Sequence, residues 1–159
     1  EDHPVNCVTW SQGRAFCEWA EGRLPSESEW EYAAKSGGQD IFWPWGGTTP
    51  TCEYAVMNQG FPGCGTSHTW PVCSKIAGNS AHGLCDLLGN VREMLEDQYH
   101  DTYSGAPADG SAWVDTPNYF WRVVRGGDLD DPDWSLSSYN RGSFLESSAG
   151  YRFGVRCAR

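Results

Sequence analysis

The stretch of the chain that decides the start of the fold is Gly22-Arg-Leu-Pro-Ser-Glu-Ser-Glu-Trp-Glu-Tyr-Ala-Ala34. Ser26 is followed three residues later by Glu29, a spacing typical of a helix start, because the two side chains can satisfy free backbone N–H groups of the first turn. Gly37-Gly38 is expected to end this helix. The apolar positions at helical spacing are Trp30, Ala33 and Ala34. The stretch therefore predicts a short helix that packs one face into a core.

A second helix is expected just upstream. Thr9 and Gln12 have the spacing of a capping box, and Gly22 is expected to stop the helix at its first non-helical position. The apolar residues between them, at helical spacing, are Ala15, Phe16, Trp19 and Ala20. The chain therefore opens with two short helices joined by a tight turn.

Downstream, regular structure is expected only near the end of the chain. Residues 41–83 and 100–116 show no hydrophobic period. Alternating side chains at Trp121–Arg125 and at Tyr151–Cys157 predict half-buried strands. The length suits one domain, and no repeat or linker divides it. The expected architecture is α+β: a single domain over residues 1–159, with two early helices, short antiparallel strands and a large loop content.

Charge and composition exclude several classes of function. The 159 residues include 11 Lys+Arg and 21 Asp+Glu, a formal net charge of −10. Because nucleic-acid binding rests on a surplus of basic residues, no nucleic-acid partner is expected. No apolar run is long enough to span a membrane. The aromatic content of 14% argues against a disordered acidic chain.

The chain is rich in cysteine, with seven residues at positions 7, 17, 52, 64, 73, 85 and 157. This number favours an oxidising compartment, extracellular or periplasmic, over the alternative of buried free thiols. No C-x-x-C pair occurs, which argues against zinc-ribbon and thioredoxin-type sites. The odd count leaves at least one thiol unpaired if the others pair within the chain.

Several ordered motifs, the stretch quoted above among them, resemble the formylglycine-generating enzyme (sulfatase-modifying factor) superfamily, and its bacterial members most of all. The other motifs are His3-Pro-Val-Asn-Cys-Val-Thr-Trp10, Ala15-Phe-Cys-Glu-Trp-Ala20, Trp43-Pro-Trp-Gly46, Gly78-Asn79, Gly83-Leu-Cys-Asp-Leu-Leu-Gly-Asn-Val-Arg-Glu93, Arg122-Val-Val-Arg-Gly-Gly127 and Gly154-Val-Arg-Cys-Ala-Arg159. The resemblance runs nearly end to end and implies a C-type-lectin-like fold. Family domains usually begin well upstream of His3, so we expect either a compact version of the domain or a piece that lacks an N-terminal segment or a partner chain.

The resemblance implies an oxidase, but the chain departs from the oxidase pattern. Catalytic members oxidise a substrate cysteine with copper and dioxygen, and hold Cu(I) with a pair of thiolates shortly after the Gly-Gly break. Here that stretch, residues 128–140, contains no cysteine. Since Cu(I) prefers soft thiolate ligands, copper is not expected.

The resemblance also implies a calcium site. The family holds calcium through side-chain and backbone oxygens at positions that match Asp86, Gly89, Val91 and Glu93. Two carboxylates and two carbonyls within eight residues also suit a hard cation on chemical grounds. The alternative is that Asp86 makes turn hydrogen bonds and Glu93 caps a short helix.

Two family motifs are altered near the expected cleft. Members usually read Gly-Asn-Val-Trp-Glu-Trp where this chain has Arg92 and Met94, and Arg-Gly-Gly-Ser-Trp where it has Asp128 and Leu129. These replacements indicate a surface reshaped for something other than the oxidase reaction.

The loop after Gly127 is the expected ligand-binding segment. Asp131-Pro132-Asp133 is similar to the carboxylate–proline–carboxylate loop with which some C-type lectins hold calcium and sugar, although short acidic runs are usually only solvated. The residues expected to bind the ligand are Asp128, Asp130, Asp131, Asp133, Trp134, Tyr139, Asn140 and Arg141.

Disulfides are expected to tie the loops down. Cys17 and Cys157 match a family disulfide that joins the first helix to the last strand, and a bond closing so long a loop would contribute on the order of 4 kcal/mol. Cys52–Cys64 and Cys73–Cys85 are further candidate pairs, which would leave Cys7 free.

The sequence therefore predicts a calcium-stabilised, non-oxidase domain that binds a protein, peptide or glycan through the loops after Gly127. Two alternatives remain open at this point. One is an oxidoreductase or sulfatase-modifying enzyme that acts on a cysteine or thiol substrate, and the other is a structural subunit.

Overall fold

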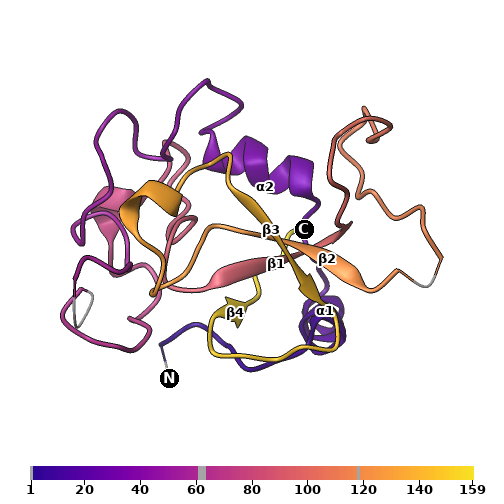
Figure 1. The fold of residues 1–159 in the computed structure, drawn as a ribbon, viewed down its shortest axis with the longest axis horizontal. Helices are drawn as coiled ribbons and strands as arrows, with labels where there is room; N and C mark the ends of the chain where they lie inside the picture. The colour runs from indigo at the N-terminus through magenta and orange to yellow at the C-terminus, as the bar shows by residue number, and fades with distance from the viewer. Residues whose placement is uncertain (1, 61–63, 118) are drawn as a thin grey trace.

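The computed structural model describes residues 2–60, 64–117 and 119–159, and it confirms an α+β fold built on one small sheet. The four strands are β1 (Arg92–Gln98), β2 (Trp121–Arg125), β3 (Arg141–Leu145) and β4 (Phe153–Gly154), in the spatial order β3-β2-β1-β4. Strands β1, β2 and β3 are antiparallel neighbours, whereas β4 runs parallel to β1. Figure 1 shows helices α1 (Trp10–Trp19) and α2 (Glu27–Ala34) on opposite sides of this sheet.

The sheet separates two hydrophobic clusters. Because neighbouring strand residues point to opposite faces, Leu95 and Val123 pack with Trp30 of α2 in one cluster. Met94 and Val124 pack with α1 residues in the other. One strand pair thus supplies both cores.

The helix starts are as predicted, but the expected stop of α1 is wrong by one residue. Thr9 and Ser26 each cap a helix in a complete capping box. After α1, the left-handed residue is Glu21, with φ 59°, and the N–H of Gly22 donates to the Cys17 carbonyl at 2.8 Å. Glycine is needed at position 22 for space, since a Cβ there would lie 2.7 Å from the Ala158 carbonyl oxygen.

The strand predicted at Tyr151–Cys157 is also shorter than its alternation indicates. Only Phe153 and Gly154 form a ladder, beside β1. Further along, the extended chain leaves the sheet and pairs through a single bridge, Arg23 with Ala158, next to the disulfide of Cys157. Phe153, Val155 and Cys157 pack against the cluster of α1, while Tyr151 is exposed, so part of the alternating pattern reports this packing and not continuous strand pairing.

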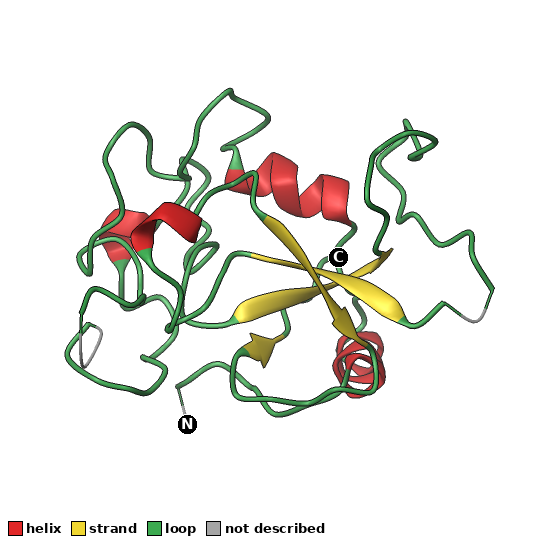
Figure 2. Cartoon of the chain, in the orientation of Figure 1, coloured by secondary structure: helices red, strands yellow, loops and turns green. Residues whose placement is uncertain are grey.

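Loops make up most of the rest of the chain, as Figure 2 shows, with short 3-10 turns at η1 (Ile76–Gly78) and η2 (Asp133–Ser135). The three predicted disulfides are present: Cys17–Cys157, Cys52–Cys64 and Cys73–Cys85. Cys7 is free and exposed, as predicted. In the described part of the chain, no helix has the length and apolarity needed to cross a bilayer.

Candidate functional site

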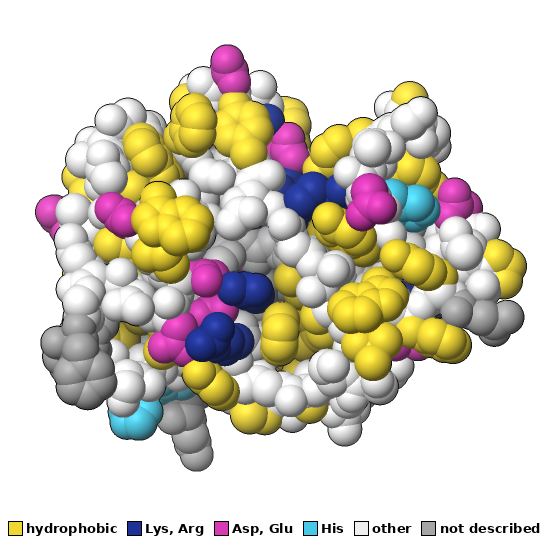
Figure 3. Space-filling view, viewed as in Figure 1, with side chains coloured by type: hydrophobic (Ala, Val, Ile, Leu, Met, Phe, Trp, Pro, Cys, Tyr) yellow, Lys and Arg dark blue, Asp and Glu magenta, His cyan; other side chains and the backbone are white. Residues whose placement is uncertain are grey.

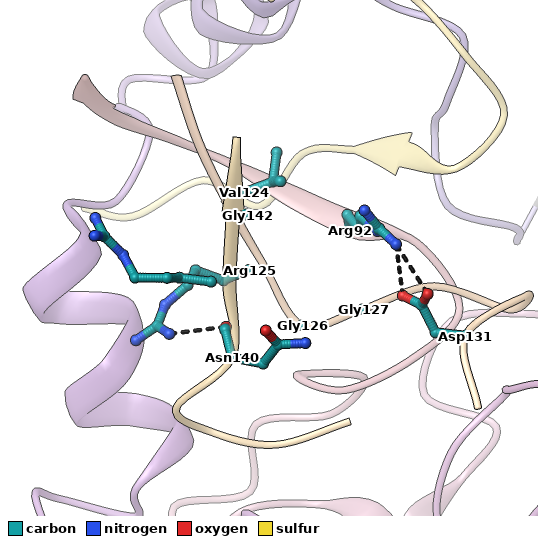
Figure 4. A pocket seen from close by; sticks show the side chains of 9 residues that line it. Arg92, Val124, Arg125, Gly126, Gly127, Asp131, Asn140 and Gly142 are labelled. Atoms are coloured by element: carbon teal, nitrogen blue, oxygen red, sulfur yellow. Dashed lines mark hydrogen bonds and ion pairs between the residues drawn. The ribbon is translucent and has the colours of Figure 1, made fainter. Parts of the chain in front are cut away.

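A small pocket of about 130 Å³ opens where the end of β2, the start of β3 and the loop after Gly127 meet. Its lining consists of Arg92, residues 124–127, Asp131 and residues 140–142. Figure 4 shows Arg92 and Asp131 facing each other on one side, with Arg125 reaching Asn140 on the other. The pocket is therefore lined mainly by charged side chains and glycine backbone.

Arg92 organises the acidic loop. Its Nη2 donates to both carboxylate oxygens of Asp131, at 2.9 and 2.8 Å. Its Nε lies 2.8 Å from Oδ2 of Asp128, whose side chain is fully buried. Burial raises the pKa of Asp128, although Arg92 acts in the opposite direction. One arginine from β1 thus holds two carboxylates of the predicted ligand loop.

The other acidic side chains of the loop differ in their surroundings. Asp130 accepts from the Tyr151 hydroxyl at 2.6 Å and pairs with Arg152 at 2.8 Å. Asp133 is exposed and accepts from the backbone N–H of Trp134.

That this acidic run offers carboxylates to a ligand or cation stays a prediction, and the structure shows which of its carboxylates already have partners. Three of its four aspartates, Asp128, Asp130 and Asp131, are already matched by two arginines. Figure 3 shows this group of acidic and basic side chains near the middle of one face, with hydrophobic side chains exposed on both sides of it. The run is an ion-paired support for the loop.

The aromatic members of the predicted site lie at the surface. Trp134 is 83% exposed. The Tyr139 ring packs 5.3 Å from the ring of Phe42, under the ammonium of Lys35, and its hydroxyl donates to Asp40. We call Phe42, Trp134 and Tyr139 the aromatic face. The loop is fixed against its neighbours by bonds from Trp43 Nε1 to the Leu136 carbonyl and from the Ser138 N–H to the Phe42 carbonyl.

The floor of the pocket is a buried ion network that the sequence did not reveal. Arg125, 1% exposed, pairs with Glu31 and donates to the Tyr139 and Asn140 carbonyls. Arg141, predicted to bind ligand, lines the pocket and donates two hydrogen bonds to Glu27. The one hint in the sequence was the spacing of Glu27 and Glu31, which lie four residues apart and therefore on the same face of α2.

The same network reaches the loop that follows β1. The Tyr103 hydroxyl donates to Glu27 at 3.0 Å. Burial, together with that carboxylate, raises the pKa of Tyr103 to about 12. Tyr103 therefore stays protonated across the physiological range and acts as a fixed donor to Glu27.

The predicted calcium residues lie in the turn before β1 and at the start of that strand, where Glu93 is the ladder partner of Arg125. Asp86, Val91 and Glu93 line one cavity of about 380 Å³, and Gly89 lies in the turn between them. Asp86 accepts from the Cys73 N–H at 2.6 Å, and burial raises its pKa. Glu93 accepts from Arg156 and from Trp30 Nε1. Carboxylate and carbonyl oxygens are the type of ligand that a hard cation such as calcium prefers. Arg156 would compete with the cation for the Glu93 carboxylate.

Comparison with known proteins decides the family. A family model described as a sulfatase-modifying factor enzyme 1-like domain matches residues 1–159. The chain belongs to this family. Among family relatives, the formylglycine-generating enzyme of Streptomyces coelicolor is 32% identical over 99% of this chain and 52% of its own length. The inactive C-alpha-formylglycine-generating enzyme 2 of Bos taurus is 33% identical over 94% of this chain and 52% of its own.

Solved structures agree with this membership of the sulfatase-modifying factor family. PvdO from Pseudomonas aeruginosa superposes with a TM-score of 0.82 at 30% identity, over 97% of this chain and 60% of that one. Treponema denticola variable protein 1, at 24% identity and a TM-score of 0.77, supports the fold alone. The chain spans from a quarter to about half the length of the curated relatives described here, which include the kinase Pkn1 of Chlamydia trachomatis at 24%.

Two of the four positions at which the chain departs from the expected family motifs meet at the pocket. Arg92 and Asp128 form a 2.8 Å ion pair there. A buried carboxylate without a partner would be costly, and so would an arginine aimed at an apolar cleft. The replacements therefore stabilise each other.

A double-mutant cycle tests this coupling. Arg92→Met alone leaves the Asp128 charge buried without its partner. We therefore expect the Arg92→Met/Asp128→Asn variant to lose less unfolding free energy than the sum of the two single variants. The difference, measured by urea unfolding, should be about 1–3 kcal/mol. The exposed pair Arg23 and Glu29 serves as the control, and its coupling should stay below about 1 kcal/mol. Additive losses at Arg92 and Asp128 would contradict the proposed coupling.

Proposed function

We propose that this domain is a ligand-binding member of the sulfatase-modifying factor family that does not itself oxidise thiols. The observation that carries the proposal is the Arg92–Asp128 pair, because it rebuilds the family's cleft with charged groups where catalytic members carry other residues. The relative called inactive C-alpha-formylglycine-generating enzyme 2 is a precedent for a non-catalytic member.

The cysteines of the chain do not fit the copper site of the family. Six of the seven are bonded in pairs, and the seventh, Cys7, lies near the start of the chain. The loop after Gly127, residues 128–140, has none. Since Cu(I) is held by thiolates, the donor set at this loop is wrong for that ion, and no step through copper is derived.

The aromatic face supports binding of a peptide, protein or glycan. Exposed aromatic side chains on a rigid support bury a large area at low conformational cost. Ion pairs from Arg92, a backbone bond to the Phe42 carbonyl and a bond from the Trp43 indole N–H hold the loop in place. Trp134 is the residue we expect to contribute most to the contact.

The test is a screen of the domain on a glycan array and against a phage-displayed peptide library, followed by variants. Trp134→Ala should weaken binding of the best glycan or peptide at least tenfold, about 1.4 kcal/mol. Trp19→Ala is a matched control, because Trp19 on α1 is 79% exposed and lies outside the aromatic face. Binding that survives Trp134→Ala, or that Trp19→Ala weakens as much, would contradict the proposed surface.

An oxidase function is the second candidate, favoured by the identity to the Streptomyces coelicolor enzyme. Oxygen uptake with Cu(I) and a cysteine peptide distinguishes the two, with that enzyme as the positive control. We expect no uptake above buffer. Formylglycine in the peptide after incubation would overturn the binding-only function.

We propose in addition that Ca²⁺ binds through the carboxylates of Asp86 and Glu93 and the carbonyls of Gly89 and Val91. The shared cavity supports this, while Arg156 already partners Glu93 and lowers the expected affinity. The ion would cross-link the turn before β1 and stabilise the fold by mass action.

Millimolar calcium should then raise the melting temperature by about 3 °C. Asp86→Asn should abolish the rise, and Asp133→Asn, an exposed carboxylate of the other acidic segment, should leave it intact. Differential scanning fluorimetry with calcium, magnesium or a chelator measures the effect. If the wild-type melting temperature is the same with calcium, with magnesium and with a chelator, the proposed calcium site is wrong.

We further propose an extracellular or periplasmic location, which the three disulfides support because such bonds persist in oxidising compartments.

A role as a structural subunit would leave both ligand screens without a Trp134-dependent binder.

A further inference from the structure

The disulfide Cys73–Cys85 lies against a carboxylate in an arrangement that the ligand-binding function does not use. The two sulfurs and a carboxylate oxygen of Asp86 all lie within 4.8 Å of one another. The Cys73 N–H fixes that carboxylate by donating to it at 2.6 Å. Among the described residues, this is the one cluster of three Cys, His, Asp or Glu side chains close enough to share a metal ion.

We propose that reduction of Cys73–Cys85 converts this cluster into a Zn²⁺ site with two thiolates and Asp86 as ligands. While the sulfurs are bonded to each other they cannot serve as thiolate ligands. Once freed, they need to lie only about 3.7 Å apart on a tetrahedron with Zn–S bonds of about 2.3 Å, and Asp86 supplies an oxygen at about 2.0 Å. The fourth position stays open to water, since Cys73 is exposed.

The redox step balances with a dithiol as reductant. The Cys73–Cys85 S–S bond breaks, two electrons and two protons pass from the dithiol, and the dithiol leaves as its own disulfide. Metal binding then displaces the two thiol protons to solvent. Thiolates select zinc over a hard cation such as calcium, so the oxidised and reduced forms of one cavity would prefer different metals.

Exposure makes this bond the first to be reduced. Cys73 is exposed, whereas Cys52 and Cys64 are both half-buried and Cys17 of the long-range disulfide is fully buried. A water-soluble reductant should therefore open Cys73–Cys85 while Cys17–Cys157 remains closed. Alkylation followed by peptide mass spectrometry should find label on Cys73 and Cys85 before it appears on Cys17.

The test titrates Co²⁺, a spectroscopic substitute for Zn²⁺, into oxidised and mildly reduced full chain in calcium-free buffer. Reduced protein should show thiolate-to-cobalt charge-transfer absorption and the visible bands of a tetrahedral site, and oxidised protein should show neither. Cys73→Ala/Cys85→Ala should abolish the signal, and Asp86→Asn should weaken the affinity at least about tenfold.

Cys52→Ala/Cys64→Ala is the matched control, because both disulfides span the same sequence separation of 12. It should leave the cobalt signal unchanged. No charge-transfer absorption in reduced wild type would overturn the site. Equal losses of cobalt signal in the two cysteine-pair variants would also overturn it, because an unfolded chain would bind cobalt through any thiol pair. An Asp86→Asn variant with wild-type cobalt affinity would exclude Asp86 as a ligand. Thiolate absorption cannot arise at an all-oxygen site, so the result is independent of the proposed calcium binding.

Discussion

Replacing Arg125 by methionine is expected to lower the free energy of unfolding by about 3–5 kcal/mol. Arg125 is 1% exposed and pairs with Glu31, while its Nε lies 3.5 Å from Glu27. Methionine fills similar space but leaves Glu31 with Lys35 alone and Glu27 with Arg141 alone, and it removes the donors to the Tyr139 and Asn140 carbonyls. Removing one partner of a buried ion pair costs far more than the pair contributes, because the remaining charge is uncompensated.

Urea unfolding followed by tryptophan fluorescence measures this loss, with Arg23→Met as the control. Arg23 pairs with Glu29 at the surface, with side chains 51% and 41% exposed, so its loss should cost less than about 1 kcal/mol. Similar losses in the two variants would show that the Arg125 network is not a buried electrostatic unit. The variant should also loosen the pocket, because Arg125 holds the Tyr139 and Asn140 carbonyls.

Removing the Cys17–Cys157 disulfide is the second change with a large expected effect. The bond joins residues separated by 140 positions, and the chain-entropy model assigns about 5 kcal/mol to a loop of that length. Cys17→Ala/Cys157→Ala should therefore lose a third or more of the roughly 5–15 kcal/mol by which a typical domain is stable. Urea unfolding under oxidising conditions measures the loss.

The Cys52–Cys64 disulfide provides the internal comparison. It spans a separation of 12, for which the same model gives about 3 kcal/mol. Cys52→Ala/Cys64→Ala should therefore be the less damaged of the two variants. The opposite order would mean that packing around the sulfurs, and not loop closure, determines what each bond contributes.

Local signals in the sequence were sufficient to predict the two helices and the strand at Trp121–Arg125. Capping boxes at Thr9 and Ser26 involve residues only three apart, so their chemistry can be read from spacing. The strand at Tyr151–Cys157 was overpredicted because alternation reports burial and does not report which partner strand is within reach. The left-handed conformation of Glu21 was missed because the expected glycine at position 22 is required by contact with Ala158, far along the chain.

The loop beside the pocket could be singled out from the sequence, but the electrostatics of the pocket could not. The loop after Gly127, its exposed Trp134 and the three disulfides were all named from sequence. What could not be read were pairings between distant residues, since Arg92 and Asp131 lie 39 positions apart and Arg125 and Glu31 lie 94 apart. A run of aspartates looks like a cation site until the arginines that face it are known.

Strand β1 supplies alternate side chains to both hydrophobic clusters, with Met94 on one face of the sheet and Leu95 on the other. The same strand carries Arg92 to the pocket and Glu93 to the cavity of the proposed calcium site. Neither half of the protein can lose its packing without releasing β1 from the other half. The domain should thus melt as one cooperative unit, and a ligand held at either site would slow the opening of the whole molecule.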